Sequence, residues 1–448
     1  MTTRSIIFER LFFMVGISDG TASIASTQTV LTRSLYHGGM TVARTVELEG
    51  HIIDSGMMET CFTIIMDMGG SFEVEEFAIG RHKTETSYAR LQVEADDEAT
   101  LQSIVHELHQ NGANPADPMD ATLEPAPADS VVPPGFYSTT NHPTDVRYDG
   151  EWVPVGDIEM DCAVVVETNG EPTARTEVLS AVEAGDLIVT GDAGIRVKPP
   201  DRPRGQEGAF GFMQGGISSE RPSESTISKI AEAIAETNRE DGEVLAVCGP
   251  ALIHSGAREA FARLVREEYI DMLSIGNGFA VHDLERDLYG TSLGMDTESL
   301  DHPRKGHKHH IYTISEIIRA GGIEAAVESG VVDSGVMYEC VRNDVPYVIA
   351  GSIRDDGPLP DTITDAVEAQ NAIREQAHRA DLVLMLSTML HSVAVGNCLP
   401  STTRTVCVDI NPATVTQLID RGSAQAVGMV TDVGTFVPIL AEYLFDER

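Results

Sequence analysis

A short acidic loop follows an apolar run in the C-terminal half of the chain. Residues 350–361, AGSIRDDGPLPD, place Arg354, Asp355 and Asp356 among two glycines and two prolines. A loop that prolines hold rigid loses little entropy on binding, so its charged groups suit preorganised contacts with a ligand. The guanidinium of Arg354 matches a carboxylate, although it could equally pair with a neighbouring aspartate. The same residues could instead form an Asx turn that only tightens a strand-to-helix connection.

A second loop, GNGFAVHD at residues 276–283, combines glycines with groups that bind or transfer protons. Gly276 and Gly278 permit close approach of the backbone to a ligand, and Asn277 supplies both a donor and an acceptor. A tight turn would explain the glycines as well. It would not explain the pair of His282 and Asp283, of which His282 is a candidate for proton transfer.

Two further candidates for proton transfer are His254 and Cys340. His254 belongs to CGPALIHSG, residues 248–256, where N–H groups at a helix start could face an anion, as they could in any strand-to-helix turn. Cys340 lies in VMYECV, and a buried core thiol is the more common role of such a residue.

Two other loops follow apolar strands. Ser387 begins STMLHSVAVGN, and Asp409 ends the strand TVCVDI. An acidic residue at a strand end often binds a ribose diol, but Asp409 could equally cap a helix with Pro412 in its first turn. No G-x-G-x-x-G motif follows a strand, so a nicotinamide cofactor would need another set of loops.

The elements that carry these loops predict an α/β fold with three sections. Residues 41–113 predict a small α+β domain, with strands at 44–52, 71–79 and 87–94 and helices at 55–68 and 97–111. The Pro- and Ala-rich residues 114–135 read as a linker, and residues 136–220 as a β-rich middle domain.

Residues 221–448 alternate strands with helix-like segments. Continuous Val, Ile and Leu runs predict strands buried on both faces, as in a doubly wound parallel sheet, at 244–248, 272–275, 347–350, 382–386 and 405–410. In such a sheet, ligands bind outside the carboxyl ends of the strands, which is where the loops described above begin.

The charge of the chain is extreme: 70 Asp and Glu residues stand against 31 Lys and Arg, a formal net charge of −39. Such self-repulsion is tolerable in concentrated salt, where the Debye length falls to about 3 Å at about 1 M, so we expect a salt-loving cytoplasmic protein. An acidic interaction surface is the alternative. The charge argues against nucleic acid as a partner, because binding phosphates requires a basic face.

Six scattered cysteines without a C-x-x-C pair fit reduced thiols in a cytosol. The apolar start is interrupted by Glu9 and Arg10, and no stretch is long enough to cross a membrane. We interpret residues 1–40 as a non-native start or a disordered tail, since a clean strand pattern begins only after Met40.

Histidines gather in DHPRKGHKHH, residues 301–310. Neighbouring Arg304, Lys305 and Lys308 would repel a metal ion, so we predict no metal site. A capture site for a carboxylate or phosphate is one reading of this basic loop, and a mobile surface loop is the other.

Several segments together carry a resemblance to a known family. Residues from VELEGHIIDSGM to YARLQV resemble the conserved domain of the bifunctional lysine-ketoglutarate reductase/saccharopine dehydrogenase. The chain is further similar to the NAD-dependent ornithine cyclodeaminases of archaea, and to the C-terminal part of a cyanobacterial arginine dihydrolase fusion, in GFYSTTNHPT, FGFMQGGISSERP, YGTSLG, MYECV, VPYVIAGSIRDDGPLPD, MLSTMLHSVAVGN and VCVDINPATVTQLIDRGS.

The resemblance implies a nicotinamide domain similar to that of deoxyhypusine synthase and conversion of L-ornithine to L-proline and ammonia, with NAD recycled in each turnover. The chain departs from the family at Gly278 and Phe279, where an Ala-Leu pair is expected, and it lacks the dihydrolase domain. The second departure means that the chain does not by itself hydrolyse arginine.

That chemistry requires a bound cofactor, a held amino-acid carboxylate, a proton acceptor and stabilisation of iminium charge. Asp356, His282, Cys340 and Arg354 are the catalytic candidates. The cofactor-binding candidates are Asn277, Gly278, Asp355, Ser387, Asp409, Asn411 and Asp432.

Two alternatives stay open. One is an NAD-dependent enzyme acting on another amino acid, such as lysine or saccharopine, and the other is a non-catalytic NAD and amino-acid sensor. We expect a homo-oligomer from the base rate for enzymes of this size.

Overall fold

The computed structural model describes residues 42–53, 55–82, 85–199, 224–296, 306–355, 357–420 and 426–446. The expectation for residues 1–40 therefore lies outside the described residues.

The N-terminal section is a two-layer α+β unit, as predicted. Its antiparallel sheet has the order β2-β3-β1-β4 and is covered by two helices. Alternate side chains of β3 are buried, which seats Ala89, Leu91 and Val93 under the helices. All three predicted strands and both predicted helices are confirmed: β1 (Val42–Gly50), α2 (Met57–Asp67), β2 (Ser71–Ala78), β3 (Ser87–Ala95) and α3 (Glu98–Gln110), with β4 (Asn114–Pro115) added.

The middle section is β-rich, with one seven-stranded sheet of order β11-β6-β7-β9-β8-β10-β5. One of its strands, Thr122–Pro125, falls inside the segment that the sequence analysis interpreted as a linker, so part of that segment belongs to this sheet. The strands are β5 (Thr122–Pro125), β6 (Thr144–Tyr148), β7 (Glu151–Gly156), β8 (Ala163–Glu167), β9 (Thr173–Glu177), β10 (Leu187–Thr190) and β11 (Ile195–Val197).

The C-terminal section is a parallel seven-stranded sheet of order β17-β16-β13-β12-β18-β19-β20. All five predicted strands are confirmed, and two more extend the edges. The strands are β12 (Val244–Cys248), β13 (Met272–Gly276), β16 (Tyr347–Ala350), β17 (Thr362–Ile363), β18 (Leu382–Leu386), β19 (Arg404–Asp409) and β20 (Ala426–Val430).

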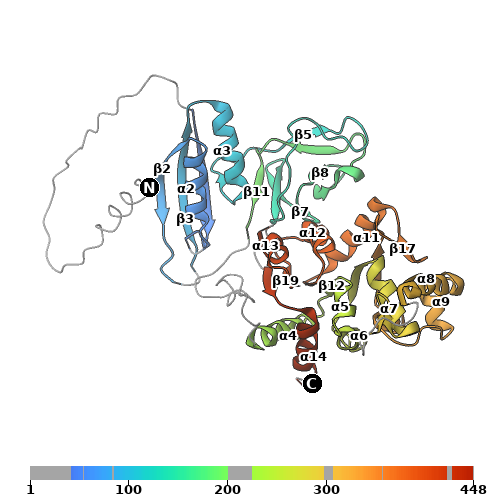
Figure 1. The fold of residues 1–448 in the computed structure, drawn as a ribbon. Coiled ribbons are helices and arrows are strands. Elements are labelled where there is room, and N and C mark those ends of the chain that lie inside the picture. The colour runs from blue at the N-terminus through green and yellow to red at the C-terminus, as the bar shows by residue number, and fades with distance from the viewer. Residues whose placement is uncertain are drawn as a thin grey trace, which may run out of the picture. The chain divides into compact units, whose positions relative to one another are not determined.

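Helices cover both faces of this sheet, as the continuous apolar runs predicted. Alternate residues of β12 enter different cores: Val244 and Ala246 pack on one face, Leu245 and Val247 on the other. Helices α4 and α14 lie side by side (Figure 1). The helices are α4 (Glu224–Arg239), α5 (Ala251–His254), α6 (Arg258–Arg266), α7 (Asn277–Tyr289), α8 (His309–Ala320), α9 (Ile323–Glu328), α10 (Val336–Arg342), α11 (Ala366–Arg379), α12 (Met389–Cys398), α13 (Pro412–Asp420) and α14 (Val433–Asp446).

Side-chain contacts join the middle section to this domain. Arg374 of α11 makes a bidentate ion pair with Glu159, with N–O distances of 2.5 and 3.1 Å, and both side chains are largely buried. His142 Nδ1 also lies 2.8 Å from the hydroxyl of Ser401.

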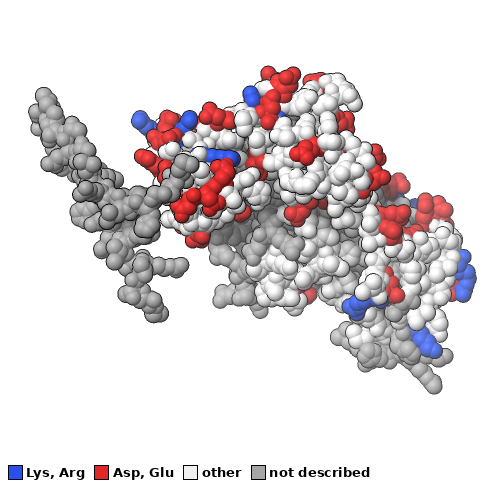
Figure 2. All heavy atoms as spheres, turned by 90° about the horizontal axis from the view of Figure 1, so that it is seen from above, with Lys and Arg blue, Asp and Glu red and all other residues white. Residues whose placement is uncertain are grey.

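Within the described residues, no helix is long and apolar enough to span a membrane. The face drawn in Figure 2 carries several groups of acidic side chains and fewer basic ones, in keeping with the composition of the chain.

Candidate functional site

The strand order places a crevice between β12 and β18. From β12 the chain adds β13, β16 and β17 on one side, and then β18, β19 and β20 on the other. The connections after β12 and β18 therefore lead to opposite faces, which is the topological switch point where open α/β sheets bind ligands.

The two connections at this switch point touch closely. A Cβ atom on Gly249 would lie 2.1 Å from the carbonyl oxygen of Ser387, so only glycine fits there. Ser387 has a φ of 52°, in the left-handed region that non-glycine residues rarely adopt. Its hydroxyl is buried without a hydrogen-bond partner in the described part of the chain. Ser387, a predicted cofactor contact, thus carries both a strained backbone and an unused polar group at the crevice.

The anion-binding interpretation of residues 248–256 loses the donors of its two first residues after the strand. The N–H of Gly249 donates to the Leu386 carbonyl at 2.8 Å, and Pro250 has no N–H. The helix that follows, α5, has only four residues. We therefore do not retain a phosphate role for this turn.

Asn277 holds the acidic loop in place. Its Nδ2 donates to the Gly357 carbonyl at 3.2 Å, while its Oδ1 accepts from the Leu359 N–H and the Thr362 hydroxyl, each at 3.0 Å. The residue is only 3% exposed. These contacts account for the position of Asn277 without a cofactor, although they also fix the loop beside the crevice.

Within that loop, the Asp355 side chain closes a turn, although not the Asx turn that the sequence analysis left open. Its Oδ2 accepts from the Ser352 N–H at 2.7 Å, which leaves the other carboxylate oxygen without a hydrogen-bond partner among the described residues. Arg354 is exposed and has no side-chain ion pair with any described residue. Asp356, the preferred catalytic carboxylate, lies outside the described residues.

A histidine that the sequence analysis did not select lies beside the same loop. His391 is on α12, and a Cβ on Gly276 would lie 3.0 Å from its Cε1 atom. Burial lowers the pKa of His391, and the nearby Asp355 opposes this effect only in part, so the ring is neutral near pH 7. His391 therefore joins the loops after β13, β16 and β18 at one place.

A second group of polar residues surrounds His282 on α7. His282 Nδ1 lies 3.0 Å from Glu285 Oε2, and its ring meets the His254 ring edge-on with centroids 5.0 Å apart. His254 Nδ1 lies 2.6 Å from the Ser292 hydroxyl. Burial, followed by the neighbouring His282, lowers the pKa of His254 to about 4. The two predicted proton-transfer histidines are thus in contact, and His254 is neutral.

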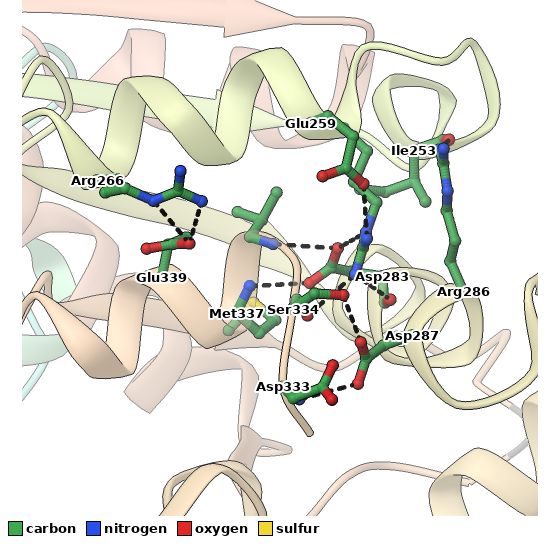
Figure 3. A network of polar contacts seen from close by, with 12 residues as sticks. Ile253, Glu259, Arg266, Asp283, Arg286, Asp287, Asp333, Ser334, Met337 and Glu339 are labelled. Atoms are coloured by element: carbon green, nitrogen blue, oxygen red, sulfur yellow. Dashed lines mark hydrogen bonds and ion pairs between the residues drawn. The ribbon is translucent and has the colours of Figure 1, made fainter. Parts of the chain in front are cut away.

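The next residue along α7, Asp283, belongs to a structural network on another face (Figure 3). It is fully buried and accepts from Arg258 Nε at 2.6 Å and from the Val336 and Met337 N–H groups at 3.2 and 2.8 Å. The carboxylate therefore neutralises a buried guanidinium and caps the start of α10. His282 and Asp283 do not act as a pair.

The burial of Cys340 removes it from the predicted catalytic residues. Its thiol is 1% exposed within the hydrophobic core, and burial raises its pKa far above the ordinary value. A thiol in this environment neither ionises near pH 7 nor meets a substrate. Cys340 is therefore a core residue, the alternative that the sequence analysis left open.

The remaining cofactor candidates lie at the carboxyl ends of β19 and β20. Asp409 Oδ1 accepts from the Asn411 N–H at 2.8 Å, and Asn411 Oδ1 accepts from the Ala413 N–H at 3.0 Å. These are helix-capping contacts, but the other oxygen of Asp409 has no hydrogen-bond partner in the described part of the chain. Asp432 is exposed and directly precedes α14. Its carboxylate and Ser255 both lie close to Gly434, the second residue of that helix.

Residues 301–305 of the basic loop lie outside the described residues, whereas Gly306–Lys308 form a 3-10 turn that leads into α8. Among the described residues, no group of His, Cys, Asp and Glu is arranged to hold a metal ion. His309 Nδ1 lies 2.8 Å from the Thr291 hydroxyl, which connects the start of α8 to the group around His282.

Two functional candidates were therefore missed from the sequence, Glu285 and His391. The i,i+3 spacing of His282 and Glu285 places them on one helical face, and this signal could have identified Glu285. No local pattern distinguishes His391, because its neighbours come from other strands.

The crevice has features that fit a dinucleotide. At Gly278 the space that a Cβ would occupy is empty, and Ser387 offers an unused hydroxyl. Ile353 and Ile410, on the loops after β16 and β19, and Leu390, in the first turn of α12, expose apolar side chains that suit flat rings.

Replacement of Gly278 by alanine tests this fit. Because a Cβ there meets no protein atom and alanine favours a helix, we expect the free energy of unfolding to stay constant or to rise by up to about 1 kcal/mol. Since alanine is the residue expected here in the family, NAD affinity, measured by calorimetry, should stay within about threefold in Gly278→Ala, whereas Gly278→Phe should lower it about tenfold or more because the ring enters the ligand space. Equal affinity in Gly278→Phe and the unmodified protein would show that no ligand approaches Gly278.

Comparisons with known proteins agree with this architecture. Residues 43–142 match the family model of the LOR/SDH bifunctional enzyme conserved region. Residues 143–227 and 228–440 match the models of arginine dihydrolase ArgZ-like proteins for the C-terminal first region and the C-terminal Rossmann fold.

Full-length relatives are also similar. The ornithine cyclodeaminase of Methanopyrus kandleri is 53% identical over 399 residues, which cover 89% of this chain and 96% of that protein. The apo crystal structure of the cyanobacterial arginine dihydrolase ArgZ is 39% identical, with a TM-score of 0.80, and covers 91% of this chain. The ternary complex of AgrE with ornithine and NAD⁺ is 40% identical, with a TM-score of 0.50, and covers 92% of this chain. The chain spans 59% of the length of each of these two structures.

Proposed function

Because this chain belongs to the ornithine cyclodeaminase family, we propose that it converts L-ornithine to L-proline and ammonia with a recycled NAD. The observation that carries the proposal is the identity of 53% over nearly the whole length of an archaeal ornithine cyclodeaminase. AgrE, which is 40% identical, has been crystallised with both ornithine and NAD⁺. The C-terminal Rossmann domain supplies the matching crevice.

The chemistry that NAD supplies when bound is removal of hydride from the ornithine Cα and its return after the δ-amine has closed the ring and ammonia has left. The residues proposed to hold it are Gly278, Ser387 and Asp409, with Asp355, Asn411 and Asp432 at the rim. Asn277 contributes by fixing the acidic loop.

The chain's own groups then have separate tasks. We assign proton acceptance from the substrate α-ammonium to His282, because its ring is oriented by a buried carboxylate. We assign the substrate carboxylate to Arg354, which is exposed and has no ion pair among the described residues. We assign stabilisation of cationic intermediates to Asp356 of the acidic loop, while its neighbour Asp355 contributes to holding the cofactor.

Deuterium labelling tests the proposed reaction. With L-ornithine deuterated at Cα, we expect proline that keeps deuterium at Cα, because the hydride returns to the carbon from which it was taken. The matched control is unlabelled ornithine in heavy water, which should give proline without deuterium at that carbon. Solvent-derived hydrogen at Cα, or conversion of lysine or saccharopine but not ornithine, would contradict the proposal.

The charge of the chain supports a salt-rich cytoplasm as its setting, where the reaction would supply proline. With a net charge of −39, screening should stabilise the folded state. We expect the Tm, followed by calorimetry, to rise by at least about 4 °C between 0.1 M and 1 M KCl, equivalent to about 1–2 kcal/mol. A Tm that falls or stays constant over this range would contradict adaptation to salt.

We also propose that the protein forms a homo-oligomer, because most oligomers of soluble proteins consist of identical subunits. The exposed apolar residues Ile353, Leu390 and Ile410 on the ligand-binding edge are compatible with either a bound dinucleotide or a neighbouring subunit.

A further inference from the structure

Glu285 is a completely buried carboxylate that the reaction scheme above does not use directly. Its Oε1 accepts from the Thr291 hydroxyl at 2.8 Å and from the Gly294 N–H at 2.9 Å. Its Oε2 faces His282 Nδ1 at 3.0 Å. Both oxygens are therefore occupied, and the carboxylate cannot rotate without breaking these contacts.

The charge state of Glu285 follows from these partners. Burial alone would raise the pKa of Glu285, but hydrogen bonds from His282, the Gly294 N–H and Thr291 together lower it below its ordinary value. An ionised carboxylate only accepts hydrogen bonds. The ring nitrogen that faces it, Nδ1 of His282, must therefore carry a hydrogen.

This leaves Nε2 as the nitrogen of His282 that gains or loses a proton. The His282 side chain is 13% exposed, so it is not sealed from solvent or ligand. The titratable side chain across from it is His254 on α5, whose neutral ring adds no repulsion when His282 becomes charged. His309 reaches Glu285 only through the Thr291 hydroxyl.

We infer that Glu285 is a positioning residue that fixes the tautomer of His282, with Nδ1 protonated and Nε2 as the acceptor of the substrate proton. The proton moves from the α-ammonium nitrogen of the substrate to Nε2, while the hydrogen on Nδ1 remains in its bond to Glu285. The catalytic part of this inference rests on the proposed cyclodeaminase reaction. The tautomer is a property of the folded chain and can be measured without turnover.

The variant Glu285→Gln tests the inference. Thr291 and Gly294 are donors and will hold the amide oxygen, so the amide NH₂ will face His282 and donate to Nδ1. His282 should then switch to the Nε2–H tautomer and lose its acceptor. In ¹⁵N-histidine NMR at a pH where His282 is neutral, we expect an Nδ1–H signature in the unmodified protein and an Nε2–H signature in the variant, with kcat reduced about 100-fold or more. The signal is assigned by its absence in His282→Gln.

Glu316→Gln on α8 is the matched control, because the Glu316 side chain is 39% exposed and, among the described residues, its ion pair is with Arg319 at the surface. It should change neither the tautomer nor kcat. An Nε2–H tautomer in the unmodified protein would overturn the inference even if the variant failed to fold. An unchanged kcat in Glu285→Gln would overturn the catalytic role. If the protein does not act on ornithine but the tautomer switches as expected, the proposed reaction fails while the positioning role of Glu285 stands.

Discussion

Replacement of His282 by glutamine should lower kcat by about 10²- to 10⁴-fold, the range over which a positioned acid–base group contributes. Glutamine can still donate to Glu285, so the buried carboxylate keeps a partner and the free energy of unfolding should change by no more than about 1 kcal/mol. Steady-state rates with L-ornithine, together with urea unfolding in concentrated KCl, measure both quantities.

The matched control is His82→Gln, an exposed histidine in the N-terminal section. It should alter neither rate nor stability. If His282→Gln retained more than about a tenth of the kcat, proton acceptance would belong to another group, and the neutral His391 beside the acidic loop would be the next candidate.

Replacement of the adjacent Asp283 by asparagine should lower the stability of the fold, whereas the His282 variant should lower kcat. Arg258 is 3% exposed and would lose its buried counter-ion, and the amide NH₂ would face either Arg258 or the N–H groups that begin α10. Breaking a buried pair on one side costs about 3–5 kcal/mol, so we expect the free energy of unfolding to fall by that amount.

Urea unfolding at constant KCl measures this loss. Arg319→Ala, which breaks an exposed ion pair with Glu316, is the control and should cost less than about 1 kcal/mol. The NAD affinity of the Asp283→Asn protein, under conditions where it remains folded, should stay within about threefold of the unmodified value. A stability loss below about 1 kcal/mol would show that the network of Figure 3 is not the stabilising element described here.

The sheet of the C-terminal domain was predictable from sequence because its strands are buried on both faces. Runs such as Val244–Cys248 and Leu382–Leu386 have no polar alternation, which distinguishes them from surface strands. The edge strands β17 and β20 were missed, since one has two residues and the other contains a glycine. The loops at the carboxyl ends followed from the sheet, and they include most of the candidate site.

The roles of individual residues were less accessible, because they depend on contacts between distant segments. His282 and Asp283 are neighbours in sequence, yet one faces Glu285 and the other faces Arg258. Cys340 carries a thiol that could react in an exposed site, but the side chain is buried in the hydrophobic core. Asn277 binds three groups of a loop that lies about 80 positions further along the chain, and no local pattern indicates such a partner.

The most direct test of the central claim is the product stoichiometry with limiting cofactor. The purified protein is incubated in concentrated KCl with L-ornithine and NAD⁺ at far less than one equivalent, and proline and ammonia are quantified. We expect equal amounts of both, in large excess over the NAD⁺, with no net NADH. Absence of both products while NAD remains bound, or NADH accumulating in proportion to the product, would contradict a cyclodeaminase that returns its hydride within each turnover.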